Sequence, residues 1–308
     1  MPTTDKNELL PPPRLCISEQ HGKQPAKYRI IDDLSRSLVN STLEVPDAYC
    51  PESLDVSAAM ARTFAEAGST DLKARSVDFS NAYKAIGLHT DSDNAATVCF
   101  ARPRDNKPFK AKILAQPFGS SRAPANWGRV VTFIQFLAMR LLTLIVASYV
   151  DDIFCCEPTA TCASGFWAFK ALTRLLGFHT SDEKGQTPAY QVYLLGAVVE
   201  LSKTCLKTTA CDERVQRLRE TIISALTSDN ITPAAASKLR GWLGFYTSLL
   251  AGKLGRGMMG QLIARQYYQK TPALTQELRR SLAWWLSALG NLKPRLLNLR
   301  FSKPIVAH

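Results

Sequence analysis

The stretch Thr143–Glu157 reads TLIVASYVDDIFCCE. Two adjacent carboxylates, Asp151 and Asp152, separate two short apolar runs, and such runs on either side of turn residues are typical of buried strands. Aspartate favours turns, so in one interpretation the pair is only the turn of a hairpin. The apolar flanks, however, place both carboxylates at the edge of a core, where two like charges are costly unless a cation compensates them. The stretch therefore predicts a hairpin that is either a plain turn or part of a cation site.

A third carboxylate has similar surroundings. Asp78 follows the short strand Ala74–Val77 and precedes the segment FSNAYKAIGL. Carboxylates at neighbouring strand ends suit hard cations, and Mg²⁺ prefers a few carboxylates together with substrate phosphates. We therefore expect Asp78, Asp151 and Asp152 to hold a pair of Mg²⁺ ions, for which Mn²⁺ could substitute. Such a pair activates an attacking hydroxyl and stabilises a leaving pyrophosphate.

The rest of the chain shows two kinds of pattern. The candidate strands are Arg75–Phe79, Thr97–Ala101, Ile113–Ala115, Thr143–Tyr149, Ile153–Glu157 and Tyr193–Leu201, and the candidate helices are Ser53–Ala67, Ala123–Leu142 and Cys162–Leu176. Residues 1–26 show little periodicity. After Cys211 we expect only helices, two of which would begin at Thr232-Pro233 and Thr271-Pro272. An α+β part is thus followed by an all-helical part, with a boundary near 205–211.

One apolar stretch, Val130–Val150, is long enough to span a bilayer. Arg140 lies in its middle, where a charged side chain costs about 2.5–3.5 kcal/mol on insertion scales. We therefore expect a buried helix to about Leu142 followed by a buried strand, and no membrane span.

The formal net charge of +12 is unevenly distributed. Residues 203–308 hold 17 Lys and Arg against 5 Asp and Glu, whereas residues 1–202 hold 21 of each. A basic region attracts a polyanion because phosphate contacts release counterions. The alternative interpretation is a basic helical surface that contacts only solvent.

The eight cysteines include no Cys-x-x-Cys pair, which disfavours zinc. The chain is large for a disulfide framework, and its first residues lack the apolar segment of a secretory leader. We expect reduced thiols in an intracellular protein, either cytoplasmic or nuclear.

Six segments in this order resemble motifs of reverse transcriptases. They are the fingers segment KYRIIDDLS at Lys27–Ser35, the first palm motif DFSNAY at Asp78–Tyr83, QPFGSSRAPA at Gln116–Ala125, YVDD at Tyr149–Asp152, LGFHTSDEK at Leu176–Lys184 and the primer-grip segment YLLG at Tyr193–Gly196. Each segment alone would be a weak signal. Together they resemble the fingers–palm–thumb region of a retrotransposon enzyme, and they imply an α+β right-hand polymerase fold. In that fold an antiparallel sheet with packed helices precedes an all-helical, thumb- or connection-like region.

The resemblance implies site residues in the palm. Asp78 and Asp151 would bind the metal ions directly, Asp152 would support them, and Lys184 would protonate the departing pyrophosphate as a general acid. Tyr83 would lie under the sugar and exclude a 2′-hydroxyl. The nucleotide-binding residues implied are Lys27, Arg29, Phe79, Tyr83, Phe118, Gly119 and Tyr149.

The resemblance also divides the chain. It implies an irregular segment 1–26, fingers and palm at 27–205, a basic thumb- or connection-like region at 206–300 and the start of an RNase H domain at 301–308. A thumb holds a duplex of any sequence through phosphate contacts. The nucleic-acid-binding residues implied are Leu195, Gly196, Arg214, Arg217, Arg219, Lys238 and Arg240.

We therefore expect an RNA-directed DNA polymerase that adds dNTPs to the primer strand of an RNA or DNA primer–template. A catalytically inactive or domesticated relative that only binds nucleic acid is the main alternative. A viral RNA-dependent RNA polymerase is disfavoured by the bulky Tyr83 and by Tyr-x-Asp-Asp in place of Gly-Asp-Asp.

Overall fold

The computed structural model describes residues 14–19, 27–44, 49–89, 97–101, 104–249, 255–269, 271–291 and 293–299. The chain divides into two compact units, each assembled from segments that are distant in sequence. The first unit comprises Met1–Ser53, Val77–Ile153 and Trp167–Gly185, and the second comprises Leu54–Ser76, Phe154–Phe166 and Gln186–His308. The four domain ranges expected from the sequence stay a prediction.

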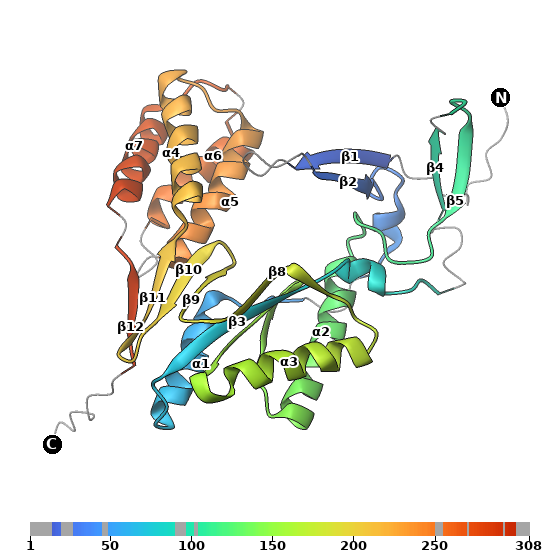
Figure 1. Cartoon of the computed structure of the whole chain (residues 1–308). Coiled ribbons are helices and arrows are strands. Elements are labelled where there is room, and N and C mark those ends of the chain that lie inside the picture. Colours follow the sequence, from blue (N-terminus) through green and yellow to red (C-terminus); the bar gives the residue numbers. More distant parts are fainter. Residues whose placement is uncertain are drawn as a thin grey trace. The chain divides into compact units, whose positions relative to one another are not determined.

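A four-stranded sheet carries the two aspartate motifs. Its strands lie in the order β6 (Ala147–Tyr149), β7 (Asp152–Pro158), β3 (Leu72–Phe79) and β8 (Thr180–Ala189), of which Figure 1 labels β3 and β8. β3 is buried at all but one of its residues, which fits a strand with neighbours on both sides. The predicted hairpin around Asp151 and Asp152 is confirmed, although its first strand begins at Ala147 and not at Thr143.

The predictions for the other strands differ in outcome. Strand β4 (Thr97–Ala101) has the predicted bounds. It pairs with β5 (Pro108–Lys112), so the strand predicted at 113–115 is wrong. Phe100 lies opposite Phe109, with ring centroids 5.3 Å apart, and this cross-strand aromatic pair stabilises the observed register.

The beginning of the described chain is not irregular. Strand β1 (Arg14–Glu19) lies within the segment expected to lack structure, and it pairs antiparallel with β2 (Lys27–Asp32). β2 also covers part of the fingers segment. The seven residues between the two strands lie outside the described residues, as do residues 1–13 and 300–308, so the expected start of an RNase H domain cannot be compared with the structure.

The helix predictions are close. α2 (Ala123–Leu142) has the predicted bounds, while α1 (Leu54–Glu66) and α3 (Thr159–Leu175) differ from the expected ranges by one to three residues at each end. The expectation that α2 is buried is wrong for one face, since Phe133, Phe136 and Met139 are each more than half exposed. Within the described residues, no helix combines the length and the apolar composition that a membrane span requires.

The second unit contains a four-stranded sheet and a helical core. The sheet has the order β12 (Arg295–Asn298), β11 (Cys205–Ala210), β10 (Ala197–Leu201) and β9 (Gln191–Leu194). The single strand predicted at Tyr193–Leu201 is therefore two strands joined by a turn. The expectation of helices only after Cys211 is wrong for β12, which returns to pair with β11.

Four helices build the core of this unit, namely α4 (Asp212–Thr227), α5 (Pro233–Leu249), α6 (Gly260–Tyr267) and α7 (Gln276–Gly290). Apolar side chains at helical spacing, such as Leu218 and Ile222 on α4, pack in one cluster with Leu282 and Trp285. The helix start at Thr232-Pro233 is confirmed. The start at Thr271-Pro272 is wrong, because the side chain of Thr275 caps α7 and accepts a hydrogen bond from the Leu278 amide.

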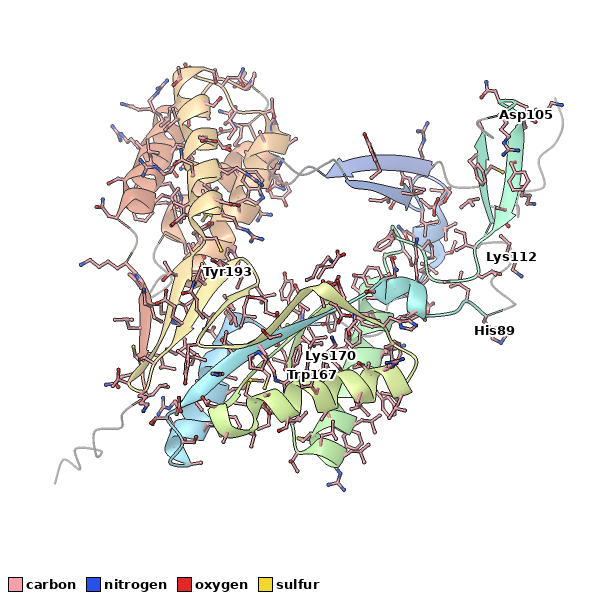
Figure 2. The ribbon with its side chains drawn as sticks, in the orientation of Figure 1. His89, Asp105, Lys112, Trp167, Lys170 and Tyr193 are labelled. Atoms are coloured by element: carbon pink, nitrogen blue, oxygen red, sulfur yellow. The ribbon has the colours of Figure 1, made fainter. Side chains whose placement is uncertain are left out.

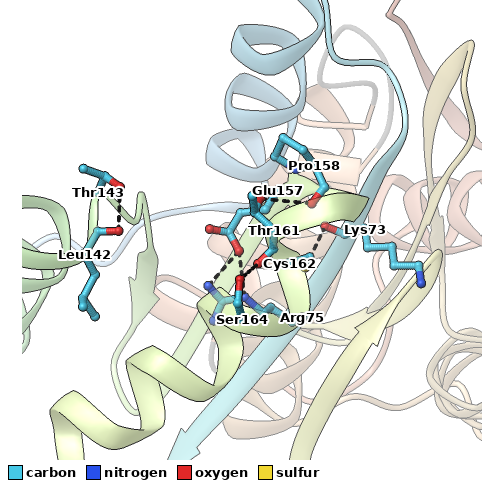
Figure 3. Close-up of polar contacts among 9 residues, drawn as sticks. All are labelled: Lys73, Arg75, Leu142, Thr143, Glu157, Pro158, Thr161, Cys162 and Ser164. Atoms are coloured by element: carbon cyan, nitrogen blue, oxygen red, sulfur yellow. Dashed lines mark hydrogen bonds and ion pairs between the residues drawn. The ribbon is translucent and has the colours of Figure 1, made fainter.

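A buried ion pair joins two strands within the second unit. Arg75 of β3 donates hydrogen bonds from Nε and Nη2 to the same oxygen of Glu157 on β7, at 3.2 and 2.9 Å, and both side chains are at most 5% exposed (Figure 3). Cys162 of α3 lies nearby and donates from its thiol to the carbonyl of Lys73 at 3.7 Å. Burial raises the pKa of Cys156 to about 12. The free thiols are those of Cys50, Cys99, Cys155, Cys156, Cys162, Cys205 and Cys211.

Candidate active site

A cavity of about 530 Å³ in the first unit brings together most of the predicted palm residues. Asp78, Phe79, Tyr83, Phe118, Asp151 and Lys184 line it, and so do Tyr28, Ile30, Ser80, Asn81, Ala82, Lys84, Val150, Ser181 and Glu183. The residues come from five separate stretches of the chain. The motifs that are distant in sequence therefore meet at one place in space.

Backbone pairing brings the first two carboxylates together. Asp78 lies next to the end of β3, and the Phe79 amide donates a hydrogen bond of 3.0 Å to the carbonyl of Asp151 in the hairpin turn. Asp78 is only 7% exposed. Strand pairing fixes which residues lie opposite one another. The backbone hydrogen bond between the two motifs therefore holds Asp78 and Asp151 at the same cavity.

Two aromatic residues that the sequence did not single out hold the hairpin turn. The Trp127 indole of α2 donates to the Val150 carbonyl at 2.7 Å, and the Val150 amide donates to the Tyr49 hydroxyl at 3.2 Å. Val150 has a φ of 57°, a left-handed conformation that is unfavourable for a β-branched residue. Both polar groups of this strained residue are satisfied by side chains that lie far from it in sequence.

The carboxylates of the site influence one another. The pKa of Asp152 is raised to about 6, first by burial and then by the negative charges of Asp151 and Asp78, while the positive charge of Lys184 lowers it. The Lys184 ammonium lies 3.1 Å from both carboxylate oxygens of Asp78.

These residues can be compared with the needs of Mg²⁺. Oxygen donors that repel one another suit a hard divalent cation. The Asp78 oxygens nevertheless face the Lys184 ammonium, and within the described residues no group of three or more His, Cys, Asp or Glu side chains is placed as a metal site. The donor chemistry fits Mg²⁺, and the metal site itself stays a prediction.

The predicted nucleotide-binding residues on the Gln116–Ala125 segment are tied to the fingers segment. Gly119 has a φ of 104°, and a Cβ placed there would lie 2.1 Å from the Asp32 carbonyl oxygen, so no side chain fits. The Asn40 amide group donates to the Gly119 carbonyl and accepts from the Ser121 amide, each at 2.9 Å. Glycine is therefore required at position 119, because the backbone there lies against the Asp32 carbonyl.

The aromatic residues of the cavity contact one another. The rings of Tyr83 and Phe118 meet edge to face, with centroids 5.5 Å apart, and the ammonium of Lys84 lies 5.8 Å from the Phe118 ring centroid. Burial, followed by the charge of Asp151, raises the pKa of Tyr83, so its phenol is protonated at neutral pH. The predicted sugar-facing residue thus has a fixed position on one wall.

The structure does not bring every predicted residue to the cavity. Tyr149, Asp152 and Gly119 are not among its lining residues, and the side chains of Lys27 and Arg29 lie outside what the structure describes. Tyr28 and Ile30 of β2 were missed; they alternate with Lys27 and Arg29, and both are exposed toward the cavity. Alternation along a strand was the signal that could have found them. Lys84 and Glu183 also line the cavity and were not predicted, because nothing in the sequence except their charge distinguishes them.

The predicted nucleic-acid-binding residues lie in the second unit. Leu195 and Gly196 form the turn between β9 and β10, beside Tyr193 of β9, which is 59% exposed (Figure 2). On α4, Arg214 and Arg217 are exposed and Arg219 is half-buried. On α5, the Lys238 ammonium lies 4.9 Å from the centroid of the Trp242 ring. Arg240 is half-buried, and its Nε has no hydrogen-bond partner within the described residues.

No protein-family model matches the chain, and no curated protein matches it. Three solved structures of foamy viral protease–reverse transcriptases are similar. The dRH form in complex with ds DNA has a TM-score of 0.62 and 18% identity over 93% of this chain and 44% of its own. The complex with RNA/DNA hybrid has a TM-score of 0.61 and 19% identity over 93% of this chain and 34% of its own. The complex with dsDNA has a TM-score of 0.61 and 18% identity over 98% of this chain and 61% of its own.

This chain therefore spans 34–61% of the length of those proteins. At such identities the similarity concerns the fold. The expected fold class is confirmed, and the chain has a fingers- and palm-like fold similar to that of the reverse transcriptases.

Proposed function

We propose that the chain is the polymerase part of a retrotransposon reverse transcriptase, which transfers nucleotides from dNTPs to the 3′-hydroxyl of a primer. One observation carries the proposal. Asp78 and Asp151, from motifs that are distant in sequence, line one cavity together with the aromatic pair Tyr83 and Phe118 and with Lys184. A pocket that combines carboxylates, a cation and aromatic walls is the expected form of such a site.

Each residue of the cavity would have a separate task. Asp78 and Asp151, supported by Asp152, would hold Mg²⁺, which when bound stabilises the negative charge of the phosphoryl group and lowers the pKa of an attacking hydroxyl. The ring of Tyr83 would occupy the space that a 2′-hydroxyl requires. The ammonium of Lys184 lies at hydrogen-bonding distance from Asp78, and it could deliver a proton to the pyrophosphate as that group leaves.

Binding of a primer–template is supported by two further observations. The foamy viral structures hold double-stranded DNA or an RNA/DNA hybrid. The excess of basic residues in this chain lies entirely in residues 203–308. A duplex that is copied regardless of sequence has to be held by phosphate contacts. The intracellular location stays a prediction.

Primer extension on an RNA template with dNTPs and Mg²⁺ tests the proposal. The wild-type chain should extend the primer, and Asp151→Asn should abolish extension, since loss of a metal-binding carboxylate costs several kcal/mol of transition-state stabilisation. Circular dichroism and template binding should be nearly unchanged in the variant. Full activity of Asp151→Asn would overturn the assignment of the site. A wild-type chain that binds primer–template and does not extend it would instead be the inactive, nucleic-acid-binding relative.

A further inference from the structure

The turn between β9 and β10 has an unusual backbone. Leu195 and Gly196 have φ angles of 51° and 85°, so both residues are left-handed. Two consecutive left-handed residues form the tight turn that matches the twist of an antiparallel hairpin, and Leu194 pairs with Ala197 across it. A left-handed conformation is unfavourable for leucine. The turn therefore needs contacts from outside the hairpin to keep its shape.

Arg214 provides such a contact. A Cβ placed on Gly196 would lie 1.9 Å from Nη1, 2.2 Å from Cζ and 2.8 Å from Nε of Arg214, so the guanidinium lies directly against the glycine backbone. The same Nη1 donates to the Leu195 carbonyl at 3.5 Å. Any side chain at position 196 would displace the arginine.

The other side of the guanidinium meets an aromatic ring. Cζ of Arg214 lies 5.9 Å from the centroid of Phe245 on α5, within the range of a cation–π contact. Arg214 itself is in the first turn of α4, which follows β11, the strand that pairs with β10. The arginine thus links α4 and α5 to the hairpin turn. By contrast, the exposed Arg217, three residues later, makes no side-chain hydrogen bond or ion pair within the described part of the chain.

We propose that Arg214 is a positioning residue, which fixes the β9–β10 turn and does not bind a phosphate. The inference rests on the proposed function: in a polymerase, Leu195 and Gly196 would contact the primer, as the resemblance of Tyr193–Gly196 to a primer-grip segment implies. A guanidinium is planar and carries five donors in a fixed arrangement, whereas an ammonium is a point charge on a flexible chain. Lysine would therefore keep the charge at this position and lose the contact with the turn.

The contact can be tested without any activity. Thermal unfolding is measured for Gly196→Ala, Arg214→Ala and the double variant. Gly196→Ala should lower Tm through both the clash with Arg214 and the left-handed backbone. In the Arg214→Ala background the same substitution should lower Tm less, because only the backbone strain is left. Additive losses would show that the two residues are not coupled and would overturn the proposal.

The functional role is tested by a salt titration of primer–template binding and by primer extension. Arg217→Ala is the matched control on the same helix. It should flatten the dependence of log K on log salt by about 0.9, as for one lost phosphate contact on a B-form duplex. Arg214→Ala should leave the slope unchanged and lower kcat several-fold at an unchanged Kd for primer–template, and Arg214→Lys should not restore kcat.

A flattened slope in Arg214→Ala, together with recovery in Arg214→Lys, would assign Arg214 to phosphate binding and overturn the proposal. If the wild-type chain extends no primer, the proposed polymerase function fails. The unfolding cycle and the salt slopes of the two variants still decide whether Arg214 positions the turn.

Discussion

The Lys184 ammonium lies 3.1 Å from both carboxylate oxygens of Asp78. The two side chains differ in exposure, since Lys184 is 52% exposed and Asp78 only 10%. A nearly buried carboxylate is thus compensated by a cation that reaches it from the solvent side. An ion pair with one exposed partner is weak and exchanges readily, so another cation could take the place of the ammonium.

The first prediction concerns this competition. Lys184→Gln should bind Mn²⁺ about three- to tenfold more tightly than the wild-type chain, because no ammonium competes for the Asp78 oxygens. Electron paramagnetic resonance of free Mn²⁺ measures the affinity directly. The control is Lys84→Gln, which removes a charge that lines the same cavity and does not pair with Asp78. Equal effects in the two variants would show that only the net charge of the cavity matters.

The same variant also tests the proposed general acid. If Lys184 protonates pyrophosphate, Lys184→Gln should bind the metal more tightly and yet have a lower kcat, by about 10²–10⁴-fold. A kcat equal to that of the wild type would restrict Lys184 to charge compensation.

The sequence predicted those parts of the site that depend on short-range signals. The hairpin at Asp151 and Asp152 and the bounds of α2 follow from apolar runs and turn residues within about 20 positions. The close approach of Gly119 to the Asp32 carbonyl, which excludes a side chain at position 119, was not predicted.

The contacts that hold the site in place could not be predicted, because they join residues distant in sequence. The Tyr49 hydroxyl accepts a hydrogen bond from the Val150 amide, which is 101 positions away in the sequence. The Lys184 ammonium donates to the Asp78 carboxylate, which is 106 positions away. β12 was missed for the same reason: its four residues follow four helices, and only pairing with β11 makes them a strand. Local patterns contain no information on such partners.

The second prediction concerns sugar selection. Tyr83→Ala should lower the ratio of kcat/KM for dNTP over rNTP by at least about tenfold, or roughly 1.4 kcal/mol, because removal of the ring opens space for a 2′-hydroxyl. Tyr83→Phe is the control: it keeps the ring that meets Phe118 edge to face, and it should retain the selectivity. An unchanged ratio in Tyr83→Ala would mean that Tyr83 only packs in the wall of the cavity.

The third prediction concerns the pH dependence of stability. The pKa of Asp152 is raised from 3.8 to about 6 in the folded chain, mainly by burial. Below pH 3.8 the group is protonated in the folded and unfolded states, and above about pH 6 it is charged in both. The cost of the buried charge is therefore absent at low pH, and stability is lost progressively as the pH rises from 3.8 to about 6.

Asp152→Asn should remove this loss. A shift of this size corresponds to at most about 3 kcal/mol, which screening at a partly exposed carboxylate reduces to about 1–2 kcal/mol. In buffer with a chelator, the variant should unfold at a higher Tm than the wild type at pH 8 and at nearly the same Tm at pH 4. A gain in Tm that is equal at both values would contradict the burial of the charge as its cause.

The last prediction concerns the buried ion pair of Arg75 and Glu157. Glu157→Gln should lower the free energy of unfolding by about 3–5 kcal/mol, because it leaves the charge of Arg75 buried without a partner. Replacement of both residues by apolar ones, Arg75→Met with Glu157→Leu, should restore most of the loss, since no charge is then desolvated.

An exposed pair in the same unit provides the control. Arg62 and Glu66 lie 3.0 Å apart on α1, and both are more than half exposed, so Glu66→Gln should change stability by no more than about 0.5 kcal/mol. Urea unfolding measures all three variants. If Glu157→Gln costs no more than Glu66→Gln, water reaches Arg75 in solution. If the apolar double variant is as unstable as Glu157→Gln, packing around the pair, and not its charge, stabilises these strands.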